Sequence, residues 1–412
     1  MLTEIGKKAK AAAAVLAITS TEDKNRILQV MADALRENCD KILEANALDI
    51  ENGKKNGMAE SLIDRLMLNS DRIEGMAQGI EGVISLPDPV GRILWETERP
   101  NGMKIQRVSV PLGVIGIIYE ARPNVTSDAA ALAIKAGNTA ILRGGKEAFN
   151  SNSVIMDIMR EAVESSGFNP DIIELVRDTS RESSTALMRM NKYVDVLIPR
   201  GSASLINAVV ENSTVPVIET GVGNCHIYVD SEADIDMATE IIFNAKTQRI
   251  SVCNTAESLL IHKDIAEYAL IAIKARLDEK NVILYGDEIA REICPDIEVA
   301  TEEDYYREYL DYKMSVKIVS SLEEAIEHIR KYSSGHSECI VTENAENAEK
   351  FMNAVDSSAV YHNVSTRFTD GGEFGFGAEI GISTQKLHAR GPLGLPQLNS
   401  FKYKIYGKGQ VR

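Results

Sequence analysis

From about residue 113 onward, short aliphatic segments alternate with longer amphipathic ones. Residues 114–118, 139–142 and 194–198 are largely apolar runs of four or five residues. The stretches between them carry apolar residues at three- and four-residue spacing, which is typical of helices. Apolar strands that alternate with helices predict a parallel sheet with helices on both faces. The pattern therefore places the chain in the α/β class.

A second alternating block begins near residue 233. We expect helices at 265–277, 322–329 and 348–355, with strands at 259–261, 282–284, 316–319 and 339–341. A chain of 412 residues with 44% hydrophobic residues is long enough for two cores. The second block is therefore predicted to be a separate α/β domain.

The chain also contains segments outside this alternation. Residues 3–90 have helical periodicity throughout, and Glu98–Gly102 is a hairpin turn between two strand-like segments. Residues 401–406 alternate like an edge strand, and such edges are usually paired, so a subunit contact is expected. We expect a nucleotide-binding domain over 1–101 and 113–230 with part of 371–395, a catalytic domain over 231–370, and a small β oligomerisation arm formed by 102–112 and 396–412.

Composition excludes several classes of function. The formal net charge of -16, without a long Lys/Arg run, argues against a nucleic-acid partner. The five cysteines are scattered and contain no Cys-x-x-Cys, so neither a disulfide framework nor a metal site is predicted. No apolar run approaches the ~20 residues of a membrane span. We expect a cytoplasmic protein that does not bind a membrane.

The strongest candidate for chemistry is Cys253, in the polar loop between an amphipathic helix and the apolar strand that begins near residue 258. Lys246 and Arg249 precede it, and neighbouring cations together with inward-facing backbone N–H groups favour a nucleophilic thiolate. The alternative is a small buried apolar residue. The polar neighbours on both sides favour the nucleophile.

Two strand ends offer places for an anionic ligand. The first contains Arg143, Gly144 and Lys146, and the second contains Gly201 and Ser202 before a helix. Glycines permit close backbone approach, cations pair with phosphate, and a helix N-terminus favours an anion. Ordinary strand-to-helix turns are the alternative for both.

Two polar side chains at other strand ends are candidates for catalysis. Glu219 follows the expected strand 215–218, where a general base would be useful, and a solvated loop carboxylate is its alternative. Asn124 opens a helix, where its side chain is either a helix cap or an amide donor to an oxyanion.

Together these features resemble the aldehyde dehydrogenase superfamily, with an aldehyde dehydrogenase-like α/β fold and a Rossmann-type nucleotide-binding domain. The segments Asn-Ala-Lys-Thr-Gln-Arg-x-x-Val-Cys-Asn at 244–254 and Tyr-Glu-Ala-Arg-Pro-Asn-Val-Thr at 119–126 narrow the match to the γ-glutamyl phosphate reductases. Residues 362–370, 373–383 and 388–392 also look like that family, and the resemblance extends to about Lys408. Ile250 departs from the pattern, which usually has proline there.

The resemblance implies a mechanism. Cys253 would attack the acyl phosphate of L-glutamyl 5-phosphate, and NADPH would reduce the resulting thioacyl enzyme to L-glutamate 5-semialdehyde, the second step of proline biosynthesis from glutamate. The Cys253 N–H and the Asn124 amide would hold the oxyanion. Glu219 matches the base of hydrolytic relatives, and its function here is left open.

The resemblance also implies binding residues and partners. Cations after the strand end at Arg143 and Lys146 favour the 2′-phosphate of NADP. We expect a homo-oligomer, and glutamate 5-kinase is a candidate partner. Cofactor contacts are expected from Arg143, Gly144, Lys146, Gly201, Ser202 and Glu308, and substrate contacts from Arg122, Ser365, Thr366, Arg367 and Asp370.

Two other functions stay open at this point. A CoA-acylating aldehyde dehydrogenase would use the same cysteine with a thioester substrate. A non-catalytic scaffold would keep only the fold.

Overall fold

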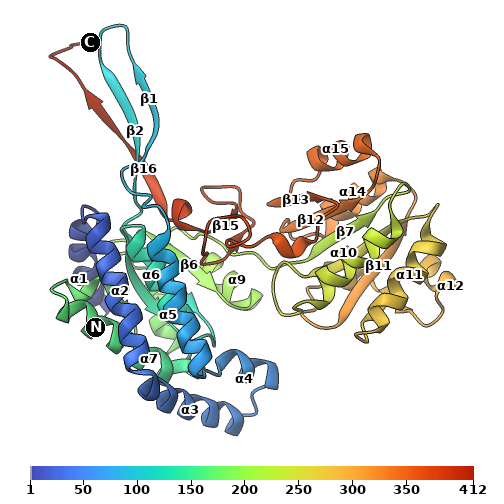
Figure 1. Ribbon diagram of the computed structural model, residues 1–412, viewed down its shortest axis with the longest axis horizontal. Coiled ribbons are helices and arrows are strands. Elements are labelled where there is room, and N and C mark those ends of the chain that lie inside the picture. The colour runs from blue at the N-terminus through green and yellow to red at the C-terminus, as the bar shows by residue number, and fades with distance from the viewer. Residues whose placement is uncertain (1) are drawn as a thin grey trace. The chain divides into compact units, whose positions relative to one another are not determined.

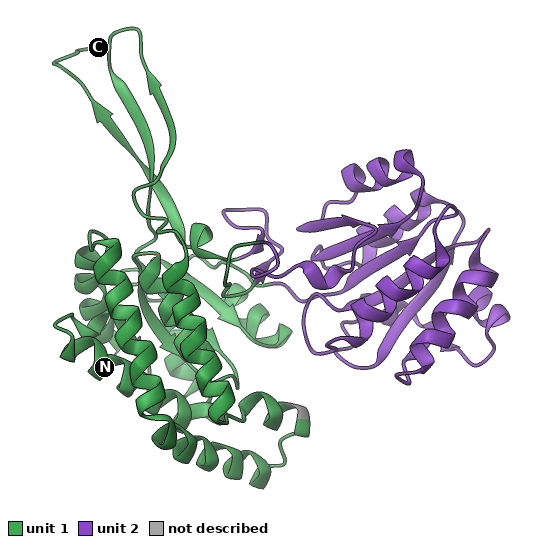
Figure 2. Ribbon diagram, in the orientation of Figure 1, with its two compact units in different colours: residues 1–220, 375–381, 393–412 green, residues 221–374, 382–392 purple. Residues whose placement is uncertain are grey.

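The computed structural model describes residues 2–412, and the chain divides into two compact units (Figure 2). Unit 1 contains the chain up to Thr220 together with Gly375–Gly381 and Leu393–Arg412. Unit 2 contains Gly221–Phe374 and Ile382–Pro392. The chain therefore crosses back to unit 1 at 375–381, re-enters unit 2 at 382–392 and ends in unit 1.

Unit 1 is organised around a parallel sheet of four strands in the order β5-β4-β3-β6, with helices packed around it (Figure 1). Every residue of β3 is buried, as expected for a central strand covered on both faces. The strands are β3 (Val114–Tyr119), β4 (Thr139–Arg143), β5 (Ile173–Leu175) and β6 (Val196–Arg200). The helices are α1 (Leu2–Leu16), α2 (Thr21–Glu37), α3 (Cys39–Lys55), α4 (Glu60–Leu66), α5 (Ser70–Ser85), α6 (Asn124–Lys135), α7 (Phe149–Ser165), α8 (Arg181–Met188) and α9 (Ala203–Asn212).

Helix α2 illustrates how the sequence specifies these elements. The hydroxyl of Ser20 accepts a hydrogen bond from the N–H of Asp23 and so caps the first turn. Ile27, Met31 and Leu35 recur at four-residue spacing and are all buried. The cap fixes where the helix begins, and the apolar stripe fixes which face is buried.

A three-stranded antiparallel sheet forms the arm of unit 1. It consists of β1 (Ile93–Glu98), β2 (Lys104–Pro111) and β16 (Asn399–Tyr406) in the order β1-β2-β16. Figure 1 shows this sheet extending away from the helices of unit 1. The turn expected at 98–102 and the edge strand expected at 401–406 are both present. The sheet also includes β1, which lies before the residues expected to form the arm.

Unit 2 is built on seven strands, all parallel, in the order β10-β9-β11-β8-β7-β12-β13. The strands are β7 (Cys225–Val229), β8 (Ala256–His262), β9 (Ile283–Gly286), β10 (Glu298–Val299), β11 (Lys313–Val319), β12 (Ser337–Val341) and β13 (Ala359–His362), with a separate pair formed by β14 (Ile382–Ser383) and β15 (Gly391–Pro392). The helices are α10 (Ile235–Thr247), α11 (Ala266–Asp278), α12 (Glu288–Ile293), α13 (Glu302–Tyr306), α14 (Leu322–Tyr332) and α15 (Ala345–Ala354).

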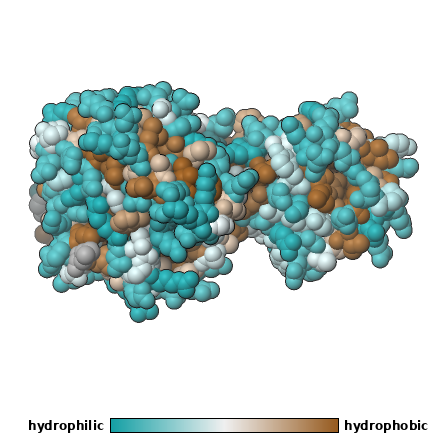
Figure 3. Space-filling view, turned by 90° about the horizontal axis from the view of Figure 1, so that it is seen from below, coloured by the Kyte–Doolittle hydropathy of each residue, from teal (hydrophilic) through white to brown (hydrophobic). Residues whose placement is uncertain are grey.

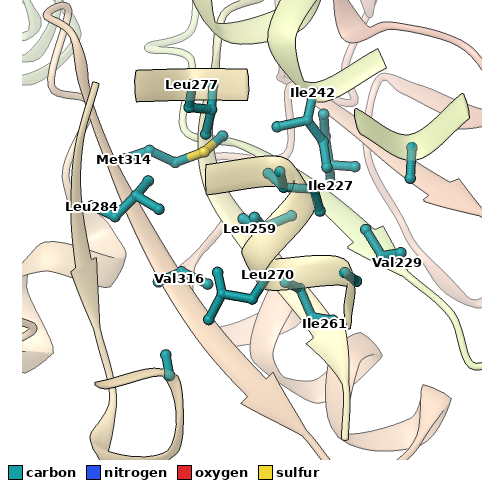
Figure 4. Close-up of a cluster of buried hydrophobic side chains, with 14 of the residues drawn as sticks. Ile227, Val229, Ile242, Leu259, Ile261, Leu270, Leu277, Leu284, Met314 and Val316 are labelled. Atoms are coloured by element: carbon teal, nitrogen blue, oxygen red, sulfur yellow. The ribbon is translucent and has the colours of Figure 1, made fainter. Parts of the chain in front are cut away.

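The core of unit 2 lies between its sheet and the helices α10 and α11. Figure 4 shows Leu259 and Val316 of the central strands packed near Ile242 and Leu270 of those helices. All four side chains are completely buried. At roughly 25 cal/mol per Å² of buried apolar surface, such a core is a main source of stability for the unit.

The structure differs from the expected elements at residues 215–218. A strand was expected there. Of these four residues, only Val217 forms a β-bridge, which is parallel and pairs it with Leu197 of β6. Pro216 accepts a hydrogen bond from the Leu197 N–H, but proline has no N–H with which to continue a ladder. The segment is therefore a single bridge beside the sheet.

The division between the units also lies earlier than the expected boundary at residue 230. Strand β7 pairs with β8 on one side and β12 on the other, so it is central to the sheet of unit 2. The division therefore falls before β7, between Thr220 and Gly221.

The face drawn in Figure 3 is mainly hydrophilic, with apolar residues scattered between polar ones. Within residues 2–412, the helices are too short or too polar to cross a membrane.

Candidate active site

The loop that carries Cys253 joins α10 to β8 in unit 2, and hydrogen bonds hold both of its sides. On one side, the carboxamide of Asn254 donates to the carbonyls of Arg367 and Thr369, at 3.2 and 3.0 Å. The hydroxyl of Thr366 returns a bond of 2.7 Å to the Asn254 carbonyl. Asn254 is thus fixed from two directions, and it immediately follows the cysteine.

The other side of the loop is closed by Thr255. Its hydroxyl donates to the carbonyl of Arg249 at 2.7 Å, and its N–H donates to the Val252 carbonyl at 3.2 Å. The segment 249–255 therefore forms a compact turn. Cys253 lies near its end with a partly buried side chain.

Lys246 was expected to favour the Cys253 thiolate, but its side chain pairs with Glu257 instead. Its ammonium lies 2.6 Å from a carboxylate oxygen of Glu257, and both side chains are fully buried. Burial raises the pKa of Glu257 to about 7, and the charge of Lys246 opposes that rise. The pair connects the end of α10 to the start of β8, so Lys246 holds the two ends of the loop together.

Arg367 is a cation whose charge acts on the cysteine. Its Nε donates to Gln248 Oε1 at 2.9 Å, and its side chain is half-buried. Burial lowers the pKa of Arg367 and the charge of Arg249 lowers it further, whereas a negative charge on Cys253 raises it. The positive charge of Arg367 and a negative charge on Cys253 therefore attract each other.

The structure assigns two further neighbours to Cys253 that the sequence analysis did not select. A Cβ atom on Gly223 would lie 1.5 Å from the Cys253 carbonyl oxygen, so only glycine fits there. The thiol of Cys225 donates to the same oxygen at 3.2 Å. The spacing Gly221-x-Gly223 was the only sequence signal for this close approach.

Glu308, expected at the cofactor ribose, lies beside the same backbone. Its carboxylate accepts a hydrogen bond of 2.7 Å from the Gly223 N–H. Cys253, Gly223 and Glu308 are therefore brought together in unit 2, although they are far apart in sequence.

The residues expected to contact substrate follow β13. The hydroxyl of Ser365 donates to Asn244 Oδ1 at 2.7 Å, and Thr366 is fully buried against the cysteine loop. Asp370 is exposed and accepts the Gly372 N–H at 2.8 Å. Ser365 and Thr366 thus hold the loop, and Arg367 carries the positive charge.

Asn124 lies in unit 1, as the first residue of α6. Pro123 occupies the cap position, so the helix-cap alternative for Asn124 is wrong. Its amide nitrogen instead donates to Asp128 Oδ2 at 2.9 Å, one turn further along α6. Burial raises the pKa of Asp128 to about 6, although the Asn124 amide lowers it. Arg122 precedes the helix, and its N–H donates to the Glu120 carbonyl at 2.6 Å.

Glu219 lies in unit 1 immediately before the division between the units, and its side chain is half-buried. The neighbouring Thr220 donates from its hydroxyl to the Pro199 carbonyl at 2.7 Å. This bond anchors the segment to the end of β6.

The expected cofactor residues of unit 1 lie at the carboxyl ends of β4 and β6, the edge where ligands bind in α/β sheets. A Cβ on Gly144 would lie 2.1 Å from the amide nitrogen of Asn152, which is buried and has no hydrogen-bond partner among the described residues. Lys146 is exposed, whereas the Arg143 guanidinium donates to the carbonyls of Thr179 and Ser180. Gly144 therefore lets the backbone pack against the buried Asn152, and the exposed ammonium of Lys146 at the end of β4 fits an anionic group of a cofactor.

The second predicted anion position is held by a carboxylate of the chain itself. Glu120 accepts the Ser202 N–H at 2.7 Å and the Ser202 hydroxyl at 2.9 Å. A Cβ on Gly201 would lie 2.5 Å from the same carboxylate. The start of α9 therefore does bind a negative group, as its dipole favours.

The fold and the cysteine loop together define an oxidoreductase of the aldehyde dehydrogenase class. The family model described as "Aldehyde dehydrogenase family" matches residues 2–299. Members of this class use a nicotinamide cofactor. The superfamily resemblance and the α/β fold class expected from the sequence are confirmed.

Relatives narrow the class further. A γ-glutamyl phosphate reductase from Clostridium novyi is 56% identical over 409 residues, which cover 99% of this chain and 98% of that protein. The crystal structure of a γ-glutamyl phosphate reductase from Thermotoga maritima matches with a TM-score of 0.98 and 49% identity, and the match covers 100% of this chain and 99% of that one. The chain belongs to the γ-glutamyl phosphate reductase family.

More distant structures share the fold alone. An acetylating aldehyde dehydrogenase from Geobacillus thermoglucosidasius matches with a TM-score of 0.72 at 19% identity, covering 100% of this chain and 97% of that one.

Proposed function

We propose that this chain reduces L-glutamyl 5-phosphate to L-glutamate 5-semialdehyde and phosphate with NADPH. This would be the second step of proline biosynthesis from glutamate. The observation that carries the proposal is Cys253 on a loop fixed on both sides, with the charge of Arg367 acting on it. The names of the near-full-length relatives supply the substrate.

The first step forms a covalent bond to the chain. The Cys253 thiolate attacks the acyl carbon of the substrate, the carbon–oxygen bond to the phosphoryl group breaks, and phosphate leaves with the bonding electrons. A thioester on Cys253 remains. Arg367 and Arg249 supply positive charge on the flanks of the nucleophile, where a dianionic phosphoryl group or a substrate carboxylate would be stabilised.

The second step requires a hydride, which a nicotinamide cofactor supplies when bound. The thioester carbon accepts the hydride, and the oxyanion that develops would be held by the backbone N–H of Cys253. Asn124 is proposed as an amide donor in the reaction, because it matches the family pattern. Collapse of the oxyanion breaks the carbon–sulfur bond, releases the aldehyde and restores the thiolate.

The cofactor would be held at the end of β4, because the Glu120 carboxylate already occupies the start of α9 after β6. Lys146 offers an exposed cation for a 2′-phosphate. Arg143 would contribute charge while its guanidinium holds the backbone at 179–180. These groups are the basis for proposing NADPH rather than NADH.

The reverse reaction tests the proposal. Wild-type protein should oxidise pyrroline-5-carboxylate with NADP only when phosphate is present, followed as NADPH absorbance. Cys253→Ala should abolish turnover, and Cys39→Ala, a partly exposed cysteine of α3, should leave it unchanged. Turnover that requires CoA and ignores phosphate would assign the chain to the acylating reaction instead. No turnover with either phosphate or CoA would favour the scaffold.

We also propose a cytoplasmic homo-oligomer that assembles through the arm. The side chains of Ile93, Trp95 and Ile405 in the arm are between 48% and 60% exposed. Exposed apolar side chains on a sheet with open edges are usually covered by a partner. Sedimentation should give a mass above that of one chain, and Trp95→Glu with Ile405→Glu should lower it. A monomeric wild-type protein would contradict this assembly.

A further inference from the structure

The backbone carbonyl of Cys253 is enclosed by the beginning of unit 2. Gly223 approaches so closely that a Cβ would overlap the carbonyl oxygen, and Cys225 Sγ lies 3.2 Å from that oxygen. Cys225 is the first residue of β7 and is fully buried. The carbonyl therefore cannot move toward either residue, and a thiol donates a hydrogen bond to it.

The thiol of Cys225 is itself held by a chain of buried groups. His336 Nδ1 lies 3.7 Å from Cys225 Sγ and 2.8 Å from the Ser337 hydroxyl. The Ser337 hydroxyl lies 2.6 Å from that of Thr369, which lies 2.7 Å from the phenol of Tyr361. Cys225, His336, Ser337 and Thr369 are completely inaccessible to solvent.

This series of buried hydrogen bonds leads to Thr369, which also holds the cysteine loop. The backbone carbonyl of Thr369 is one of the two carbonyls that accept the Asn254 carboxamide. The carbonyl of Cys253 and the side chain of Asn254 are therefore attached to opposite ends of one buried network.

Fixing the Cys253 carbonyl has a geometric consequence for the nucleophile. The direction of this carbonyl sets the ψ angle of Cys253, and the Cα–Cβ bond turns with it relative to the fixed β8. If the thiol were removed, the carbonyl would lose this hydrogen bond, so the loop would be freer to rotate. The sulfur of Cys253 would then point elsewhere.

We propose that Cys225 is a positioning residue, whose thiol aims the Cys253 nucleophile by holding its backbone carbonyl. The inference rests on the proposed function only in taking Cys253 as the nucleophile. Cys225 does not touch substrate. A residue that served only to fill space in the sheet would affect stability without affecting the reactivity of Cys253.

The chain offers a matched control for that distinction. Cys339 lies in β12 of the same sheet, is equally inaccessible, and its thiol donates at 3.4 Å to the Ile340 carbonyl. Replacing either cysteine with alanine removes one buried sulfur atom from the same sheet. Only Cys225 touches the catalytic loop.

The test measures the alkylation of Cys253 by iodoacetamide across pH, read by mass spectrometry of the Cys253 peptide, beside turnover and thermal unfolding. In Cys225→Ala we expect the alkylation rate and kcat to fall by about tenfold, the size of one hydrogen bond, with KM unchanged. Cys225→Ser, which keeps a donor, should restore both to within about threefold. Cys339→Ala should lower the unfolding temperature as much as Cys225→Ala and leave alkylation at the wild-type rate.

Three results would overturn the inference: wild-type alkylation in Cys225→Ala, an equal loss in Cys339→Ala, or no recovery in Cys225→Ser. Cys225→Val removes the donor while retaining bulk, and gives the same comparison if the alanine variant does not fold. Alkylation needs no glutamyl phosphate, so absence of reductase activity in wild type would refute the proposed function and leave this test intact.

Discussion

The ammonium of Lys246 lies 2.6 Å from the carboxylate of Glu257, with both side chains completely buried in unit 2. The pair spans the whole catalytic loop, because one partner lies in the last turn of α10 and the other in β8. A second bond, from the Leu310 N–H to Glu257 at 3.2 Å, connects the pair to the segment before β11.

Removing one member of this pair should destabilise the protein strongly. Lys246→Met leaves a buried carboxylate without its cation, and we expect a loss of about 3–5 kcal/mol in the free energy of unfolding by urea denaturation. The double variant Lys246→Met/Glu257→Leu should recover to within about 1 kcal/mol of wild type, since both charges are gone.

The surface pair Lys55–Glu51, also 2.6 Å apart, is the control for that experiment. Lys55→Met should cost less than about 1 kcal/mol, because solvent screens exposed ion pairs. Equal losses in the free energy of unfolding for Lys246→Met and Lys55→Met would show that burial does not make the Lys246–Glu257 pair more important for stability.

Glu338 of β12 should make stability depend on pH. Its carboxyl accepts the His226 N–H at 2.7 Å and a Ser357 hydroxyl bond at 3.2 Å, and burial raises its pKa to about 8. The folded protein therefore keeps a proton that the unfolded chain releases near pH 4.5. This contribution to stability is fully present below pH 4.5, falls as the pH rises, and is lost above about pH 8.

The variant Glu338→Gln isolates that effect. Between pH 5 and pH 8, wild type should lose stability relative to Glu338→Gln, by roughly 1.4 kcal/mol per pH unit at most. Unfolding by urea at several pH values measures the difference, in which the contribution of Glu257 cancels. Parallel curves for the two proteins would show that Glu338 is ionised in the native state.

Gly223→Ala should inactivate the enzyme. A Cβ at this position would lie 1.5 Å from the Cys253 carbonyl oxygen, a backbone atom, so the catalytic loop must shift. A displacement of about 1 Å is enough to cost on the order of a hundredfold in turnover. Gly75→Ala in α5, where a Cβ meets nothing within 4 Å, should keep full activity and raise stability by about 0.5–1 kcal/mol. Steady-state assays and urea denaturation of both variants test this contrast.

Lys146→Ala should weaken NADPH more than NADH. Loss of a charged hydrogen bond to the 2′-phosphate would raise the Kd for NADPH by roughly 10- to 100-fold and leave that for NADH unchanged, as measured by titration of cofactor fluorescence. Lys192→Ala removes a lysine that lies near the ring of Tyr193 in the same unit, and should change neither. An equal effect on both cofactors would show that Lys146 does not discriminate between them.

The sequence was sufficient for the fold class and for most of the elements, because apolar strands and amphipathic helices are local patterns. It failed at Pro216, where the apolar run 215–218 resembles a strand but lacks the N–H needed to extend a ladder. It also placed the domain division after β7, since the pairing of β7 with β8 and β12 is not visible in local pattern.

The candidate site was predictable only in part. Cys253 and Arg367 lie in polar segments that attract attention, whereas Cys225 lies in an apolar strand, 28 residues before Cys253. Lys246 is close to Cys253 in sequence, yet the helix turns its side chain toward Glu257. Which way a side chain points at the end of a helix depends on tertiary packing, and sequence spacing does not reveal it.

The return of the chain to unit 1 has a consequence for biosynthesis. Strand β16 pairs with β2 along its length, and Asn138 Nδ2 donates to the Leu398 carbonyl at 2.9 Å just before that strand. The ribosome adds these residues only after the whole of unit 2 has been made. The arm of a nascent chain therefore lacks an outer strand, and β2 keeps an open edge, until translation has passed residue 406. A fragment ending at Thr220 would keep that open edge permanently, so unit 1 cannot be completed by its N-terminal sequence alone.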